Sequence, residues 1–138
     1  MPQANAAYSV KSWNRKAWHD TPAEITGANL FRIEMIHLYN GDIEGEATIQ
    51  YLVSQNGDGK GNFVALEKVT GSVGSRSGSF VFQRIGTFDN GKIKETLTVM
   101  PGSGTDELNG LSGQATFEGD QHQERYPITF DYEFEVTQ

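Results

Sequence analysis

The stretch that decides the fold is residues 63–117, FVALEKVTGSVGSRSGSFVFQRIGTFDNGKIKETLTVMPGSGTDELNGLSGQATF. Within it, apolar residues alternate with polar ones in short segments, and glycine-rich turns separate these segments. Alternation with a period of two is typical of β-strands that are buried on one face only. The stretch therefore predicts four strands, over residues 63–73, 80–88, 93–100 and 111–118.

The same alternation continues on both sides of this stretch. It is strongest over residues 126–136, where apolar and aromatic residues face one way and threonine and carboxylates face the other. Three further strands are predicted before the central stretch. They cover residues 6–14, 30–40 and 43–53.

The first strand and the segment after it are the least regular part of the pattern. Simple alternation places Val10 and Trp13 on opposite faces of the first strand. Residues 15–29 have no sustained period, so we expect a long connection in which Trp18 and Ile25 act as anchors. Such a connection would cover one end of the fold.

The turns and the number of strands predict how the sheet is arranged. Asn40-Gly41 and Asn90-Gly91 are dipeptides that tolerate positive φ angles, which tight β-hairpins require. Eight antiparallel strands joined mostly by short turns must hide an apolar face and two sheet edges, and closing the sheet on itself hides both. We therefore predict an all-β fold, an eight-stranded antiparallel barrel that is closed or nearly closed and forms one domain over residues 1–138.

Composition excludes several classes of function. The chain has 138 residues, no cysteine and a net charge of −7, from 18 acidic and 11 basic residues. Nucleic-acid binders carry a basic stripe, which is missing here, and the lack of cysteine rules out disulfides and a thiol nucleophile. No apolar run is long enough for a signal peptide or a membrane helix, so the expectation is a cytoplasmic protein without nucleic-acid or membrane partners.

Several segments together resemble a known family. These are SVKSWN near the start, GDIEGEATIQYL, FVALEKVTGSVGSRSGSFVFQRIGTFDNG and LTVMPGSGTDELNGLSGQATF. They resemble an uncharacterised family of small bacterial proteins that is catalogued as a domain of unknown function, and the resemblance covers nearly the whole chain. It implies a fold similar to the allene oxide cyclase-like barrels, because GSGTDELNGLSG is similar to a glycine-rich strand corner of plant allene oxide cyclases and dirigent proteins. It implies no reaction.

No motif predicts a cofactor or a metal. The glycine-rich residues 101–105 lack the lysine and the following helix of a phosphate-binding loop, so a structural strand corner is the expected role. The histidines His19, His37 and His122 are not spaced to place two imidazoles on one face of an element, which argues against a metal site.

Four ionisable residues fall on apolar strand faces and are the candidate catalytic residues. They are His37, Glu67, Arg84 and Glu95. If they face inward, the buried charges must neutralise one another, with Arg84 between the two carboxylates. The alternative is a bulge or a register shift that leaves these charges in solvent.

Three hypotheses about function follow. In the first, the barrel binds a small, mostly apolar molecule, and Glu67 or Arg84 holds its polar end. In the second, the protein is an isomerase or a cyclase that uses Glu67 or Glu95 as acid and base, with Arg84 stabilising negative charge. In the third, the barrel is filled and acts through its outer face, by forming a homo-oligomer or by contacting a partner. The side chains predicted to line a ligand site are Phe31, Met35, Tyr51, Phe82, Phe130 and Tyr132.

Overall fold

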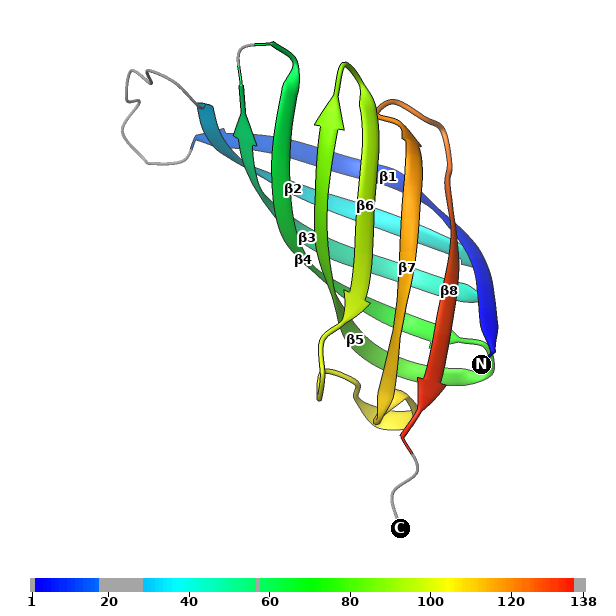
Figure 1. Ribbon diagram of the computed structural model, residues 1–138. Coiled ribbons are helices and arrows are strands. Elements are labelled where there is room, and N and C mark those ends of the chain that lie inside the picture. Colours follow the sequence, from blue (N-terminus) through cyan, green and yellow to red (C-terminus); the bar gives the residue numbers. More distant parts are fainter. Residues whose placement is uncertain (1, 18–28, 57, 136–138) are drawn as a thin grey trace.

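The computed structural model describes residues 2–17, 29–56 and 58–135, and the segment with Trp18, His19 and Ile25 lies outside these ranges. Eight antiparallel strands form one closed barrel in chain order (Figure 1), as the alternation predicts. Among the described residues, no helix is long and apolar enough to cross a membrane. The elements are β1 (Gln3–Ala17), β2 (Asn29–Gly41), β3 (Ile43–Gln55), β4 (Lys60–Val73), β5 (Arg76–Asp89), β6 (Lys92–Val99), the single-turn 3-10 helix η1 (Asp106–Leu108), β7 (Leu111–Asp120) and β8 (Tyr126–Phe134).

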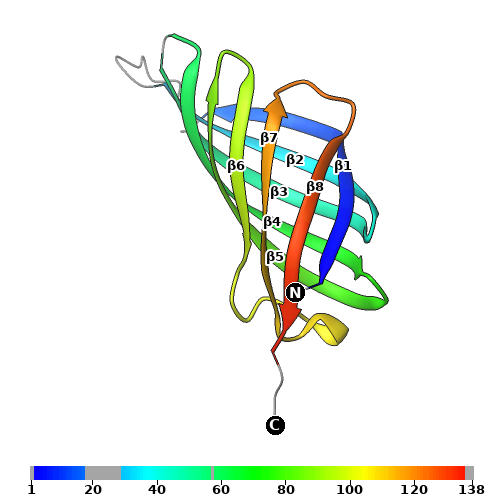
Figure 2. The same ribbon diagram turned by 45° about the vertical axis from the view of Figure 1, so that its right-hand side comes forward.

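The barrel closes where the first strand meets the last. Antiparallel pairing between β1 and β8 runs from Gln3 opposite Asp131 to Tyr8 opposite Tyr126. The two strands lie side by side in both ribbon views (Figure 2). This seam joins parts of the chain that are far apart in sequence, and it leaves neither β1 nor β8 with a free edge along the paired residues.

A β-bulge in β1 corrects one prediction. Val10 pairs with His37 and Ser12 pairs with Ile36, so Lys11 is an extra residue between them. The extra residue reverses the alternation, and Trp13 is therefore on the same face as Val10 rather than on the opposite one. The bulge brings the Trp13 side chain to the open end of the barrel interior.

One half of the barrel interior is filled by apolar side chains. This half lies toward η1, at the lower end of the barrel in Figure 1. Phe82 packs edge-to-face on Phe80 and Phe130, with ring centroids 4.9 and 5.4 Å apart, and Leu108 of η1 is completely buried. Small inward residues such as Ala47 leave room for these rings. The core cluster extends beyond this half, since its members Tyr8 and Tyr126 also line the cavity described below. It comprises Ala4, Ala6, Tyr8, Tyr39, Ile43, Ala47, Val69, Val73, Phe80, Phe82, Leu97, Val99, Leu108, Leu111, Ala115, Phe117, Tyr126, Ile128 and Phe130.

The glycine-rich connection after β6 pairs with the first half of β5, beyond the end of its pairing with β6. Met100 N–H donates to the Val81 carbonyl, and Thr105 N–H donates to the Ser79 carbonyl, at 2.8 and 2.9 Å. The Ser103 hydroxyl accepts a bond from the Val81 N–H. The segment therefore acts as a structural strand corner, as the sequence predicts, because its backbone groups already bond to β5.

Two facing glycines bring β3 and β4 close together. Gly45 lies opposite Gly71, and a Cβ atom at Gly71 would be 1.9 Å from the Glu44 carbonyl oxygen and 2.8 Å from the Gly45 Cα. These neighbours are backbone atoms, which cannot move away without distorting the sheet.

We expect Gly71→Ala to destabilise the barrel by about 1–3 kcal/mol, the usual cost of overpacking. Chemical denaturation would measure the loss, with Lys68→Ala, an exposed position on the same strand, as the control. Equal stability of the two variants would show that the strands separate easily at this point.

Candidate functional site

The second half of the barrel interior is a cavity that opens to solvent. Its volume is about 430 Å³. Its lining includes residues of the β3–β4, β5–β6 and β7–β8 connections, namely Gly59, Asn90, Gly91 and Gln121. These connections lie at the upper end of the barrel in Figure 1, so the mouth of the cavity is at that end. Most of its wall is apolar or aromatic. Tyr8, His37 and Glu95 are the polar lining residues next to the buried network, and the other polar lining residues are Arg15, Gln55, Asn90 and Gln121. The wall includes Ile33, Met35, Tyr51, Phe63, Phe88 and Ile93.

A buried ion-pair network separates this cavity from the filled half. Arg84 of β5 is fully buried, and it lies between Glu67 of β4 and Glu95 of β6. Its Nε donates to Glu67 Oε1 at 2.9 Å, and its Nη1 donates to Glu95 Oε1 at 2.6 Å. The period of two holds without interruption in these three adjacent strands, which is why all three side chains face inward, the first of the two alternatives that the sequence leaves open.

Two tyrosines and a histidine complete the network from β1 and β2. Tyr39 donates its hydroxyl proton to Glu67 Oε1 at 2.9 Å and accepts a bond from Arg84 Nη2 at 2.9 Å. Tyr8 accepts a bond from Arg84 Nη1 and lies stacked on the His37 ring, with centroids 4.4 Å apart. His37 Nδ1 lies 2.8 Å from Glu67 Oε2.

The electrostatics of the network hold Glu67, Arg84 and His37 each in one protonation state at neutral pH. Burial alone would raise the pKa of Glu67, but the Arg84 guanidinium and the hydrogen bond from His37 outweigh it and lower the pKa to about 2. Burial would also lower the pKa of Arg84, but Glu67 and Glu95 raise it well above its usual value. Burial lowers the pKa of His37 despite its bond to Glu67. His37 is therefore neutral, with its proton on Nδ1 facing an ionised Glu67.

Some polar atoms at the inner end of the cavity have no partner. Glu95 Oε2 is buried without a hydrogen bond, although Glu95 Oε1 is bonded to Arg84 and Tyr8. Within the described ranges, His37 Nε2 also has no partner, because the Glu67 bond uses Nδ1. The hydroxyl of Tyr51, on the cavity wall, likewise has none among these residues. By contrast, all three nitrogens of Arg84 and both oxygens of Glu67 are already engaged.

The structure brings together the four residues that the sequence singles out as catalytic candidates. His37, Glu67, Arg84 and Glu95 are all buried and belong to one connected network. A role for them in catalysis stays a prediction. The hydroxyl partners Tyr8 and Tyr39 are not among the predicted site residues, although period-two alternation puts Tyr39 on the same strand face as His37.

The predicted ligand-lining residues divide between the two halves of the barrel. Phe31, Met35 and Tyr51 line the cavity. Phe82 and Phe130 are completely buried in the filled half, and Tyr132 packs against that core, so these three do not line it. Alternation predicts which face a side chain occupies but not its height in the barrel, which depends on strand tilt and stagger. The lining residues that were missed include Trp13, Ile33, Phe63, Phe88 and Ile93.

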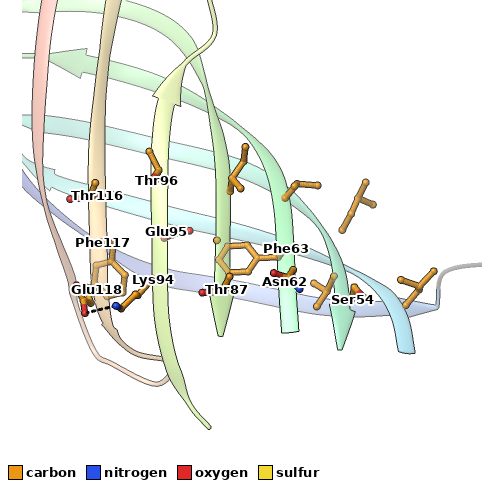
Figure 3. A pocket seen from close by; sticks show the side chains of 16 residues that line it. Ser54, Asn62, Phe63, Thr87, Lys94, Glu95, Thr96, Thr116, Phe117 and Glu118 are labelled. Carbon is orange, nitrogen blue, oxygen red and sulfur yellow. Dashed lines mark ion pairs between the residues drawn. The ribbon is translucent and has the colours of Figure 1, made fainter. Parts of the chain in front are cut away.

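A second, larger hollow lies on the outer side of the sheet. It has a volume of about 810 Å³ and extends across β2–β7 (Figure 3). Its lining combines apolar side chains, among them the exposed Leu52, Val64 and Ile85, with threonines. It also carries the exposed ion pair between Lys94 and Glu118, which Figure 3 marks with a dashed line. Most of its polar groups face solvent, so this hollow has fewer features of a specific site than the cavity inside the barrel.

Metal-ligand clusters are not found in the part of the chain that the structure describes. No three histidine, aspartate or glutamate side chains within it are grouped so that they could hold a metal ion. The polar groups at the inner end of the cavity act instead as hydrogen-bonding and ion-pairing partners.

Comparisons with known proteins agree with the fold. Residues 4–132 match a family described as "Protein of unknown function (DUF3224)". A crystal structure of a protein of unknown function from that family, from Shewanella oneidensis, is 25% identical in sequence, with a TM-score of 0.79 and 99% of each chain covered. A comparison with curated proteins finds no match.

Proposed function

Because the chain belongs to the DUF3224 family, whose function is unknown, we propose a function from the site itself: the open half of the barrel binds a small, mostly apolar molecule. The cavity is the observation that carries this proposal. Its volume of about 430 Å³ falls in the range of about 300–1,000 Å³ that is usual for small-molecule sites.

The apolar side chains of the cavity wall favour a ligand that is mostly apolar. Side chains such as Ile33, Phe88 and Ile93 line a space that is open to solvent at one end. Covering this apolar surface would remove it from water, which is favourable by about 25 cal/mol per Å². The polar network closes the other end, so a bound molecule would rest against it.

We expect Met35→Trp to weaken the binding of a fluorescent apolar probe, N-phenyl-naphthylamine, by at least about tenfold, or about 1.4 kcal/mol. Met35 lines the cavity, and an indole in its place would occupy the space that the probe needs. Fluorescence titration would measure the two dissociation constants.

The matched control for this test is Leu66→Trp. Leu66 is 55% exposed on the outer face of β4, so an indole there leaves the cavity unchanged. If Met35→Trp bound the probe as tightly as Leu66→Trp does, the probe would not be in the barrel, and the proposal would fail.

Native mass spectrometry would identify a natural ligand. The protein would be purified gently from its own host and weighed before and after denaturation. A reproducible added mass that is lost on denaturation would identify the ligand's chemical class. The same spectra would report the oligomeric state, which tests the prediction of a homo-oligomer.

The arrangement of His37 and Glu67 favours a second candidate function, an isomerase. Glu67 holds the Nδ1 proton of His37 and leaves Nε2 at the cavity, the arrangement of an oriented general base. Glu67 itself is less suited to acid–base catalysis, since both of its oxygens accept hydrogen bonds and its pKa is about 2. Turnover of a bound molecule that is lost in His37→Gln, while the molecule still binds, would distinguish catalysis from binding alone.

A further inference from the structure

The polar groups at the inner end of the cavity contain more free hydrogen-bond acceptors than free donors. Arg84 gives its N–H groups to Glu67, Glu95, Tyr8 and Tyr39, and none of its nitrogens is left for a ligand. The free atoms nearest the network are Glu95 Oε2 and His37 Nε2. A carboxylate oxygen and the unprotonated nitrogen of a neutral imidazole can only accept a hydrogen bond.

The unpaired oxygen of Glu95 is the more informative of the two. The Glu95 side chain is 3% exposed, and the residue belongs both to the network and to the cavity lining. A buried carboxylate oxygen without a hydrogen-bond donor raises the free energy of the folded chain, because its hydrogen bonds to water are lost and no protein donor replaces them. A donor on a bound molecule would remove this cost.

The charges around this position favour the same kind of group. Two carboxylates, those of Glu67 and Glu95, surround one guanidinium, that of Arg84, and His37 is neutral. The network therefore carries an excess of negative charge, which repels an anion and attracts a cation.

From these observations, and resting on the proposed binding function, we infer that the polar end of the ligand is a hydrogen-bond donor, either a hydroxyl or a protonated amine, and not a carboxylate. The donor lies at the inner end of the cavity against Glu95 and His37, and the apolar body extends toward the mouth. The hydroxyl of Tyr51 can donate or accept, so it is compatible with either donor.

The rival arrangement is an acid bound in the reverse orientation. Arg15 lies among the cavity-lining residues at the mouth, where its guanidinium stacks 3.9 Å from the centre of the Phe31 ring. A carboxylate at the mouth would meet this cation, with the apolar body directed inward. Arg15 is exposed, so water screens its charge, whereas the unpaired Glu95 oxygen is buried.

The test compares three probes that share one apolar body: decylamine, decanol and decanoate. Each would displace N-phenyl-naphthylamine from the wild-type protein, and the three dissociation constants would be compared. We expect decylamine or decanol to bind at least about tenfold more tightly than decanoate, a difference of about 1.4 kcal/mol. This ranking of affinities is measured on the wild-type protein, so it does not depend on whether a variant folds.

Glu95→Gln then tests the acceptor directly. An amide keeps the shape of the side chain but adds a donor and removes the charge, so the preference for decylamine over decanoate should fall by about tenfold. Glu118→Gln is the matched control, because Glu118 is exposed on β7 and its ion pair with Lys94 lies on the outer face. The control should keep the wild-type ranking.

The outcomes separate this inference from the proposed function. If neither the fluorescent probe nor any of the three compounds binds, the proposed function itself fails. If they bind but decanoate binds as tightly as the amine and the alcohol, the inference fails while the binding function stands. Tight decanoate binding that is lost in Arg15→Gln would establish the reverse orientation.

Discussion

Replacing Arg84 with alanine should reduce the free energy of unfolding by about 3–5 kcal/mol, the usual cost of breaking a buried ion pair from one side. The substitution would leave Glu67 and Glu95 buried without a counter-ion, and it would remove the donor of the bonds to Tyr8 and Tyr39. Equilibrium denaturation in urea, followed by tryptophan fluorescence, would measure the loss.

Two further variants show whether charge or volume is responsible. Arg84→Met keeps most of the side-chain volume but still leaves the carboxylates unpaired, so it should be nearly as destabilising as alanine. Arg125→Ala, at an exposed loop position, should change stability by no more than about 0.5 kcal/mol. A loss of that small size in Arg84→Ala would show that the carboxylates find other partners or take up protons.

Acid should destabilise the barrel through the same network, by about 3 kcal/mol from Glu67 alone. The pKa of Glu67 is about 2 in the folded chain against an ordinary value of 4.5. Since the folded value is the lower one, its stabilisation is fully present above pH 4.5 and is lost as the pH falls toward 2. His37 also makes the folded chain less stable in acid, and its effect begins at a higher pH. The pKa of His37 is lowered from 6.5 in the folded chain, so below pH 6.5 the unfolded chain takes up this proton more readily than the folded chain does.

The pH dependence of unfolding in Glu67→Gln checks this attribution. An amide does not titrate, so the variant should be less stable at neutral pH and its stability should fall less steeply between about pH 4.5 and 2. Glu46→Gln, which removes an exposed carboxylate that lies 3.8 Å from Lys11, should keep the wild-type slope. If the wild type and Glu67→Gln lost stability in parallel over this range, the acid sensitivity would come from other groups.

Inward placement of the three central network residues is one of two alternatives that the sequence leaves open, and it holds because these residues sit on uninterrupted strands. Glu67, Arg84 and Glu95 keep the period of two of their apolar neighbours, and adjacent strands with regular pairing bring them together. The same reasoning fails for Trp13. The extra residue Lys11 reverses the alternation ahead of Trp13, and the composition of the strand gives no sign of this bulge.

Alternation also does not predict the height of a side chain within the barrel. Phe31 and Phe82 both face inward, yet Phe31 lines the cavity and Phe82 is in the filled half. Their heights follow from the register of every strand pair around the barrel, and this register emerges only when the sheet is closed. For the same reason, the hydrogen bonds that Tyr8 and Tyr39 make across the interior could not be predicted from local pattern.

The seam between β1 and β8 has a consequence for how the chain folds. Hairpin pairs from β2 to β8 join neighbours in sequence, whereas the pairing of Gln3 with Asp131 needs almost the whole chain. Bringing such distant segments together has a large entropic cost, so non-local pairing of this kind is slow. During synthesis, β1 has no partner on its outer edge until β8 has left the ribosome. The growing chain therefore passes through a stage with an open strand edge, when it is most exposed to aggregation and to pairing with another copy.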